Sequence, residues 1–406
     1  MRFSATPQEQ LQILTTGVVD LVTRDELLSR LEKAYQTGKP LVVKLGADPS
    51  APDIHLGHTV VLQKMRQFQA LGHEVVFLIG DFTGRVGDPT GKKKTRPALS
   101  EEEVLANAET YKAQIGKILD LERTRIEFNS RWLAPLNFAD VLKLTAQYTV
   151  ARMLERDDFA TRYKNQVPIS IVEFLYPLMQ GYDSVALHAD VELGGVDQTF
   201  NLLVGRDLQK AYGQAPQVIM TMPILEGLDG KEKMSKSLGN YVGINEPPDQ
   251  IYGKLMSIPD ELMGKYFELL TDLTPTQLAE VKERASREPK AVKMLLARRI
   301  TAMYHGEVAA AQAEAGFEKL FGKTGDGLPE DLEEARVVAP PEGLTLIRLL
   351  TMTGLAPSGG EAKRLLQQGG VRVDQVKQAD PQRLFHKGET FILQAGKRGF
   401  RRVVLE

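Results

Sequence analysis

The chain has 406 residues, no cysteine and a formal net charge of −2. This length suffices for two or three domains with a large core. The lack of cysteine excludes disulfides and thiol chemistry, and the lack of an apolar run of 18 residues excludes a membrane-spanning helix. Because the first residues also lack the apolar core of a signal peptide, we expect a cytoplasmic protein.

The first part of the chain shows the strand–turn–helix–strand pattern of a parallel α/β sheet. Residues 41–47 are predicted to be a strand, residues 48–53 carry the prolines and aspartates of a turn, and helical periodicity runs from Thr59 to about residue 72. The continuous apolar run at 75–79 is typical of a buried parallel strand. We therefore expect an α/β fold with a Rossmann-like doubly wound sheet and ligands at the carboxyl ends of its strands.

Two histidines, His55 and His58, lie where this helix is expected to begin. Two surface histidines would give the same pattern. A zinc pair is disfavoured because the chain has six histidines, no cysteine and no glutamate beside this pair. The third interpretation is a phosphate site, because a helix N-terminus offers free N–H groups and a positive dipole end, and Gly57 leaves room for a ligand.

The loop at residues 80–96 is rich in glycine and ends in a basic cluster. It is not a P-loop, because Val86 replaces the first glycine and Lys93 follows Lys92 where serine or threonine is needed. With its carboxylate Asp88, the loop can still line a nucleotide or amino-acid pocket. An exposed basic turn is the alternative.

Three polar residues share one face of a later predicted helix. Tyr176, Gln180 and Asp183 are spaced i, i+4 and i+7. An aromatic ring, an amide and a carboxylate could together hold a small polar aromatic ligand, although a polar face toward solvent would look the same. The single tryptophan, Trp132, is expected to serve packing rather than function.

The predicted strand at 189–193 ends in glycines and a carboxylate. Gly194 and Gly195 permit close approach of a ribose, and Asp197 could accept a hydrogen bond from one of its hydroxyls.

The segment at residues 233–237 reads KMSKS. Its two lysines, three residues apart on a loop rich in glycine and serine, could clamp a polyphosphate and neutralise charge as the α-phosphorus is attacked. A solvated basic loop is the alternative. However, this segment follows the HxGH pair by about 175 residues. That combination is the signature of class I aminoacyl-tRNA synthetases, which the chain resembles, and it favours the phosphate interpretation for both segments.

Changes in composition and helical patterning divide the chain into several parts. Together with the class I resemblance, they lead us to expect a catalytic Rossmann-like domain at 1–245 with a helical insertion at about 120–185, an α-helical tRNA-binding domain at 246–325, a linker at 326–342 and a small α+β domain at 343–406. From Pro341 to Glu406 there are 11 Lys and Arg against 6 Asp and Glu, a net charge of +5, so the rest of the chain carries −7. A basic tail on an acidic body indicates RNA binding.

Within class I, nearly the whole chain resembles the bacterial tyrosyl-tRNA synthetases, whose basic tail is an S4-like RNA-binding domain. The resemblance implies that ATP, with Mg²⁺, activates L-tyrosine to tyrosyl-adenylate, and that tyrosine then moves to the 3′ end of tRNA(Tyr). It implies no protein-bound metal. It also implies a homodimer, for which we expect the helices between about 130 and 155 to form the interface.

The same resemblance implies roles for individual residues. The catalytic residues would be His55, His58, Lys233, Lys236, Ser237, Lys92 and Arg96. The residues that bind tyrosine would be Lys44, Asp88, Tyr176, Gln180, Asp183 and Gln198. The ATP-binding residues would be Gly46, Asp48, His55, Gly57, His58, Gly195, Asp197 and Lys236. The tRNA-binding residues would be Lys363, Arg364, Arg372, Lys397 and Arg398.

One position departs from the family pattern. Lys44 stands where many members have a tyrosine that bonds the substrate phenol, so we expect Asp183 to be the main phenol partner. Asp81 is acidic where many members have a small residue. We therefore hypothesise an ion pair between Lys44 and Asp81 at the floor of the pocket.

Three other functions are compatible with parts of the sequence. A tryptophanyl-tRNA synthetase could use the helix carboxylate to accept an indole N–H. A small-molecule adenylyltransferase shares HxGH, but 406 residues with a basic tail exceed that family. A non-catalytic RNA-binding protein on a synthetase scaffold should have lost His55, His58 or Lys233, and all three are present.

Overall fold

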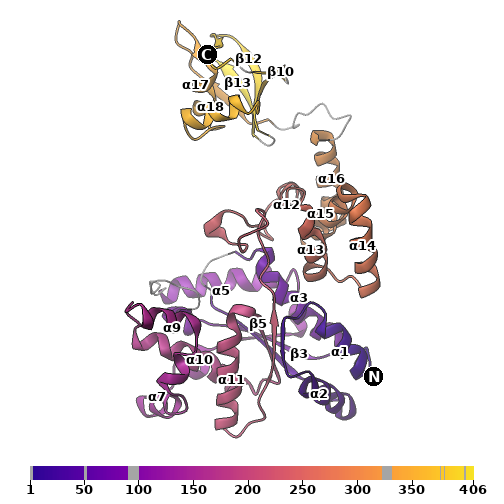
Figure 1. The fold of residues 1–406 in the computed structure, drawn as a ribbon, viewed down its shortest axis with the longest axis vertical. Coiled ribbons are helices and arrows are strands. Elements are labelled where there is room, and N and C mark those ends of the chain that lie inside the picture. The colour runs from indigo at the N-terminus through magenta and orange to yellow at the C-terminus, as the bar shows by residue number, and fades with distance from the viewer. Residues whose placement is uncertain are drawn as a thin grey trace. The chain divides into compact units, whose positions relative to one another are not determined.

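The computed structural model describes residues 3–49, 53–89, 100–321, 332–374, 376–378, 380–396 and 399–406. Figure 1 traces them along the chain. Contacts divide the chain into two compact units, Met1–Ala310 and Ala311–Glu406. The boundary that the sequence predicts near residue 245 stays a prediction.

The first unit is built on a six-stranded sheet in the order β1-β6-β5-β2-β3-β4. Strand β1 runs antiparallel to β6, and the other pairings are parallel. This confirms the Rossmann-like doubly wound sheet, and buried apolar runs supply its central strands. The strands are β1 (Asp20–Val22), β2 (Val42–Ala47), β3 (Glu74–Ile79), β4 (Thr124–Phe128), β5 (Val191–Gly195) and β6 (Val218–Met222).

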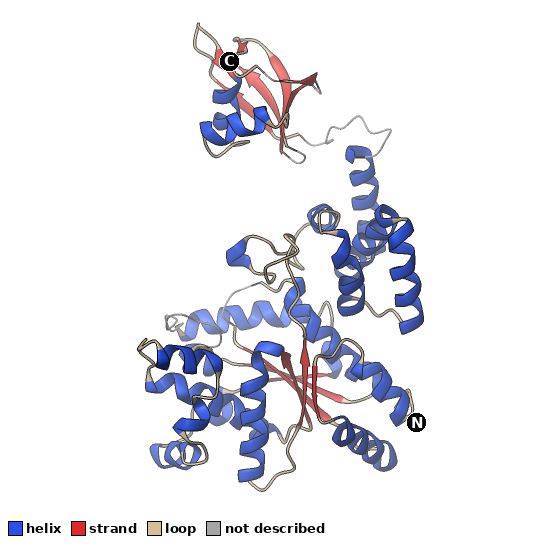
Figure 2. Ribbon diagram, viewed as in Figure 1, coloured by secondary structure: helices blue, strands red, loops and turns tan. Residues whose placement is uncertain are grey.

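Helices cover both faces of this sheet (Figures 1 and 2). Helices α3 (Leu56–Leu71) and α5 (Glu101–Ile115) lie on one face, and α10 (Ile171–Leu187) and α11 (Thr199–Ala211) lie on the other. Helix α3 begins at the N-cap His55 and ends at Gly72, whose φ of 100° is in the left-handed region that favours glycine.

The sheet reverses its strand order between β2 and β5. The two strands pair only through Val43 with Val191 and Lys44 with Glu192. Beyond these pairs the strands separate, with Gly46 and Gly194 near their carboxyl ends. A crevice at such a switch point is where open α/β sheets bind ligands.

Further helices complete the first unit. Three short ones, α7 (Phe138–Thr145), α8 (Val150–Met153) and α9 (Asp157–Lys164), lie within the helical insertion expected at about 120–185. The remaining helices near the sheet are α1 (Pro7–Thr15), α2 (Arg24–Thr37), α4 (Thr83–Val86), η1 (Leu121–Arg123), α6 (Ser130–Leu133), η2 (Val196–Gln198) and η3 (Lys236–Leu238). After residue 247 come α12 (Pro248–Leu255), η4 (Asp260–Leu262), α13 (Met263–Leu270), α14 (Pro275–Arg287), α15 (Pro289–His305) and α16 (Glu307–Phe321).

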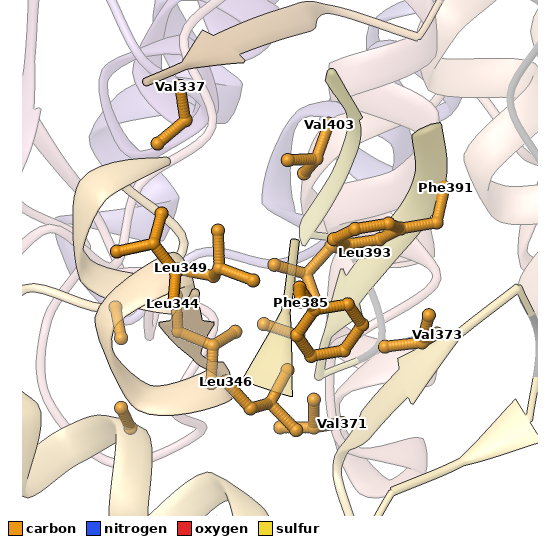
Figure 3. Packing of buried hydrophobic residues seen from close by; sticks show 14 of the residues in the cluster. Val337, Leu344, Leu346, Leu349, Val371, Val373, Phe385, Phe391, Leu393 and Val403 are labelled. Atoms are coloured by element: carbon orange, nitrogen blue, oxygen red, sulfur yellow. The ribbon is translucent and has the colours of Figure 1, made fainter. Parts of the chain in front are cut away.

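The second unit combines a five-stranded sheet, in the order β10-β9-β12-β13-β7, with a two-stranded sheet and two short helices. Leucine, valine and phenylalanine side chains from these elements form one core (Figure 3). The elements are β7 (Glu334–Val337), β8 (Leu344–Thr345), α17 (Leu346–Met352), α18 (Gly359–Gln367), β9 (Val371–Val373), β10 (Val376–Lys377), β11 (Leu384–Phe385), β12 (Thr390–Ala395) and β13 (Gly399–Leu405).

Strand β7 lies inside the range 326–342 that the sequence predicts to be a linker. It pairs in parallel with β13, and Val337 is buried in the core of the second unit. This hydrogen bonding and burial make residues 334–337 part of the folded unit rather than a linker. No described helix is both long and apolar enough to cross a membrane.

Candidate active site

A pocket of about 750 Å³ opens at the carboxyl ends of β2 and β5. It brings together most of the site residues that the sequence predicts, from segments far apart in the chain. These are Gly46, Asp48, His55, Gly57, His58, Asp88, Tyr176, Gln180, Asp183, Gly195, Asp197, Gln198, Lys233, Lys236 and Ser237. Lys44 lies outside this lining, and Lys92 and Arg96 lie outside the described residues.

The two histidines at the start of α3 hold each other in a fixed arrangement. The backbone N–H of Gly57 donates to Nδ1 of His55 over 3.1 Å, and the N–H of His55 donates to Nδ1 of His58 over 3.2 Å. Because Nδ1 is an acceptor in both rings, a neutral imidazole carries its proton on Nε2. A Cβ at Gly57 would lie 3.0 Å from the His55 ring, so a larger residue would displace that ring.

Both imidazoles are neutral near pH 7. Burial, with a contribution from His58 and Lys236, lowers the pKa of His55 to about 3. Burial and Lys236 lower the pKa of His58 to about 4. Neutral rings with a proton on Nε2 are hydrogen-bond donors. They can therefore stabilise phosphate oxygens without carrying a full charge.

The KMSKS loop is anchored beside the histidines. The backbone N–H of Ser235 donates to Asn240 over 2.8 Å, and that amide in turn donates to Asp229 over 2.8 Å. Met234 is buried, whereas Lys233 is exposed. Lys236 forms an ion pair with Asp53 over 3.3 Å. Both ammonium groups are therefore within reach of an anion in the pocket, and the backbone between them is fixed.

Asp183 is a buried carboxylate whose two oxygens each accept a hydrogen bond. Trp132 Nε1 donates to Oδ1 over 2.8 Å, and Asn129 Nδ2 donates to Oδ2 over 3.3 Å. Burial raises the pKa of Asp183 to about 7, against the opposing effects of Lys44 and these two donors. The carboxylate is thus aimed into the pocket and can accept a further hydrogen bond from a ligand hydroxyl.

The hypothesised ion pair between Lys44 and Asp81 is wrong. Lys44 Nζ pairs with Glu192 Oε1 over 2.9 Å, and the two side chains are 0% and 1% exposed. Lys44 also donates to Ser184 Oγ over 2.8 Å. Asp81 instead accepts from the N–H and hydroxyl of Ser130 at the start of α6. The register explains the difference, because Lys44 lies directly opposite Glu192 in the sheet.

The other end of the pocket is rich in hydrogen-bond acceptors. The Tyr176 hydroxyl donates to Asp48 over 2.8 Å, so its own oxygen can only accept from a ligand. Burial and the Asp48 carboxylate raise the pKa of Tyr176, which keeps this hydroxyl protonated. Asp88 accepts from Gln198 Nε2 over 3.0 Å. These groups suit a ligand cation.

Asp197 and Gly195 lie together after β5. Asp197 is exposed at the pocket, and a Cβ on Gly195 would lie 2.5 Å from its carboxylate. Glycine at this position therefore allows the carboxylate to lie close to the backbone at the edge of the pocket.

The predicted tRNA-binding residues belong to the second unit. Lys363 and Arg364 are exposed on α18, Arg372 is exposed on β9, and Arg364 pairs with Glu361 over 2.6 Å. Lys397 and Arg398 lie outside the described residues. Among the described residues, no group of three or more His, Cys, Asp and Glu side chains could hold a metal ion.

The sequence interpretation missed several residues of this site. Trp132 serves packing but also donates to Asp183, and Asn129, Glu192 and Asn240 had no motif to mark them. Only the position of Asn129 directly after a strand offered a signal, because strand ends in parallel sheets face the ligand crevice.

We predict that His55 and His58 remain neutral with the proton on Nε2 between about pH 5.5 and 8. Because both folded pKa values lie below the ordinary value of about 6.5, protonation favours the unfolded state, and these residues lower stability as the pH falls below about 6.5. Imidazole ¹⁵N–¹H correlation spectra of the folded protein test this, with His55→Gln and His58→Gln variants to assign the signals. The urea-unfolded protein is the control, and titration of either folded ring near pH 6.5 would contradict the assignment.

Comparison with known proteins places the chain in a family. A family model described as tRNA synthetases class I (W and Y) matches residues 36–322. The tyrosine–tRNA ligase of Moorella thermoacetica is 58% identical over 97% of this chain and 95% of that protein. The tyrosine–tRNA ligase of Geobacter sulfurreducens is 55% identical over 97% of this chain and 98% of that protein.

Solved structures support the fold. A C-terminally truncated mitochondrial tyrosyl-tRNA synthetase from Aspergillus nidulans matches with a TM-score of 0.65 and 22% identity, covering 78% of this chain and 99% of that one. A tyrosyl-tRNA synthetase from Archaeoglobus fulgidus complexed with L-tyrosine matches with a TM-score of 0.61 and 23% identity, covering 76% and 100%. The family model and the bacterial relatives show that the chain belongs to the class I tRNA synthetases of the tryptophan and tyrosine family, in the group of bacterial tyrosine–tRNA ligases.

Proposed function

We propose that the protein is a tyrosine–tRNA ligase, which activates L-tyrosine with ATP and transfers it to the 3′ end of tRNA(Tyr). One observation carries the proposal. A single pocket joins the N–H donors of His55 and His58, the lysines of the KMSKS loop and the buried carboxylate of Asp183. The first two groups suit a polyphosphate and the third suits a hydroxyl, so the pocket fits ATP and tyrosine together.

The first step is attack of the tyrosine carboxylate on the α-phosphorus of ATP. The bond from this phosphorus to the bridging oxygen breaks, pyrophosphate leaves, and tyrosyl-adenylate remains bound. Because the substrate supplies the nucleophile, the protein needs only to position the reactants and to stabilise developing charge. His55 and His58 donate to phosphate oxygens, and Lys233, Lys236 and Ser237 contact them from the loop.

Recognition of tyrosine uses both ends of the amino-acid site. Asp183 accepts the phenol O–H, and the acceptors Tyr176, Gln180 and Asp88 surround the ammonium group beside Gln198. A buried carboxylate built to accept a hydroxyl rejects phenylalanine, because that substrate would leave it unpaired. Lys44 does not contact tyrosine directly. It supports the helix that carries Gln180 and Asp183, through its bonds to the Gln180 carbonyl and the Ser184 hydroxyl.

ATP, as its Mg²⁺ complex, occupies the side of the pocket formed by β2, β5 and α3. Gly46 and Gly57 permit its close approach, Asp48 lies beside it, and Asp197 with Gly195 accepts the ribose. In the second step, the terminal hydroxyl of the tRNA attacks the tyrosyl carbonyl and AMP leaves. Lys92 and Arg96 would contribute loop cations near the phosphates, and the basic residues of the second unit (Lys363, Arg364, Arg372, Lys397 and Arg398) would hold the tRNA.

The protein would act in the cytoplasm as a homodimer. In the range where we expect the interface, apolar side chains face solvent without cover. Phe138 is 77% exposed, Leu142 55% and Val150 63%. Exposed apolar side chains of this kind on α7 and α8 support association with a second copy.

We predict exchange of labelled pyrophosphate into ATP with tyrosine, and none above background with tryptophan or phenylalanine. Subsequent charging of tRNA(Tyr) tests the second step. Exchange with tryptophan would support the proposed activation of an amino acid by ATP but would contradict the proposed specificity for tyrosine. No exchange with any of the three would overturn the proposed activity and favour a non-catalytic RNA-binding protein.

We predict that tyrosine binds about tenfold more tightly at pH 8 than at pH 6. The phenol O–H requires an ionised Asp183, whose pKa is about 7, whereas His55 and His58 are neutral over this range. Calorimetric titration at several pH values measures the effect, and Asp183→Asn should weaken binding and abolish the pH step. An affinity that is constant, or that rises toward acid pH, would contradict a hydrogen bond from the phenol O–H to the Asp183 carboxylate.

We predict that the double variant Phe138→Glu and Leu142→Glu sediments as a monomer of about 45.0 kDa, whereas the unmodified protein sediments as a dimer. Charges buried at an apolar interface would be desolvated without partners. Val308→Glu is the matched control, because Val308 is 74% exposed but lies on α16. A monomeric unmodified protein, or a dimeric double variant, would remove the proposed interface.

A further inference from the structure

Two buried polar residues outside the pocket lining connect the groups proposed to bind the tyrosine ammonium. Arg156 lies at the N-cap of α9 and is 6% exposed, and Asn201 lies on α11 and is 1% exposed. Neither lines the pocket, and neither belongs to a motif that the sequence analysis identified. Both nevertheless contact residues that do line it.

Asn201 joins the two glutamines of the site. Its Nδ2 donates to Gln180 Oε1 over 3.1 Å and to Gln198 Oε1 over 3.1 Å. Gln198 Nε2 then donates to Asp88 Oδ2 over 3.0 Å. One amide therefore fixes two glutamine oxygens, and through Gln198 it also orients the carboxylate of Asp88.

Arg156 holds the other side of this network. Its Nη1 donates to Asn201 Oδ1 over 3.2 Å. Its Nε and Nη2 form two bonds to Asp158 over 2.7 and 2.8 Å, and the guanidinium lies 4.5 Å from the centre of the Phe159 ring. Nη2 also lies 3.9 Å from Asp88 Oδ1. The guanidinium is therefore locked in place before any substrate arrives.

The polarity of every bond in the network follows from this guanidinium. Arginine has only donors, so Asn201 must turn its oxygen toward Arg156 and its amino group toward the glutamines. Both glutamine oxygens must then face Asn201, and the amino group of Gln198 must face Asp88. An isolated glutamine could rotate its amide by half a turn and present a donor where an ammonium needs an acceptor.

We propose that Arg156 and Asn201 are positioning residues that set the hydrogen-bond direction of the ammonium site and thereby strengthen binding of the tyrosine amino group. This inference rests on the proposed function. It predicts that the two residues affect the amino group of the substrate but neither its phenol nor the phosphates of ATP.

The variant Asn201→Asp tests this with little change of shape. It keeps an acceptor for Arg156 but replaces the donor to both glutamines by an oxygen. A second variant, Arg156→Lys, keeps the charge but loses the directed bonds of the guanidinium. Its matched control is Arg162→Lys, because the Arg162 side chain is also 6% exposed and forms two bonds to Glu173, away from the pocket lining.

For each full-length variant and for the unmodified protein, we would measure the dissociation constants of three ligands. We would also measure the KM of ATP in pyrophosphate exchange. The ligands are tyrosine, tyramine (ammonium but no carboxylate) and 3-(4-hydroxyphenyl)propanoate (carboxylate but no ammonium). We expect Asn201→Asp and Arg156→Lys to weaken the binding of tyrosine and tyramine by about 10- to 100-fold, which is the range for one hydrogen bond to a charged group. The dissociation constant of the propanoate and the KM of ATP should change by less than about twofold. Arg162→Lys should leave all three dissociation constants and the KM unchanged.

Equal loss for all three ligands would overturn the inference, since it would indicate a general structural role. Unchanged affinity for tyramine would overturn it as well. If circular dichroism shows that one variant does not fold, the other carries the same comparison. Failure of the unmodified protein to exchange pyrophosphate with tyrosine would instead overturn the proposed function, so the two failures are distinguishable.

Discussion

The active site depends on the ion pair between Lys44 and Glu192, which lies where β2 and β5 pair for the last time before they separate. Burial of two charges is costly unless hydrogen bonds satisfy both. Here Ser184 donates to Glu192 over 3.0 Å, Gln217 donates to the same carboxylate, and Lys44 donates to Gln180 and Ser184. Removal of one partner would leave a buried charge unpaired, a loss of about 3–5 kcal/mol.

This pair also connects the sheet to α10. The carbonyl of Gln180 and the hydroxyl of Ser184 both accept from Lys44, and both lie on the helix that carries Asp183. Bonds from a fully buried ammonium group thereby fix the position of this helix against the sheet. The carboxylate proposed to accept the phenol thus projects from a rigid support, as a site that discriminates one hydroxyl requires.

The pocket has a fixed hydrogen-bond polarity at each of its ends. The histidine rings offer donors because backbone N–H groups occupy their Nδ1 atoms. Asp183 is an acceptor held by Trp132 and Asn129, and the Tyr176 oxygen is an acceptor because its proton goes to Asp48. Groups that are oriented before the substrate binds stabilise charge without reorganising during the reaction.

Residue patterns in the sequence, together with the family resemblance that they carry, were enough to predict the doubly wound sheet and many, though not all, of the residues that line the pocket. His55, Tyr176 and Lys233 could be identified as candidate site residues because each lies in a local segment of distinctive periodicity or composition. The Lys44 partner could not be predicted in this way. Strand β3 follows β2 in the chain, but the neighbour that supplies Glu192 is β5, about 145 residues later. Likewise Arg156 and Asn201 acquire their roles only through tertiary contacts, and β7 becomes a strand only through its pairing with β13.

The decisive measurement is a crystal structure of the full chain with a non-hydrolysable analogue of tyrosyl-adenylate. We expect the phenol oxygen within hydrogen-bond distance of Asp183, and the ammonium among Tyr176, Gln180 and Asp88. We also expect the Lys44–Glu192 ion pair to remain intact in the complex. A phenol bonded to Lys44 instead of Asp183, or a ligand bound in the reverse direction, would contradict this arrangement.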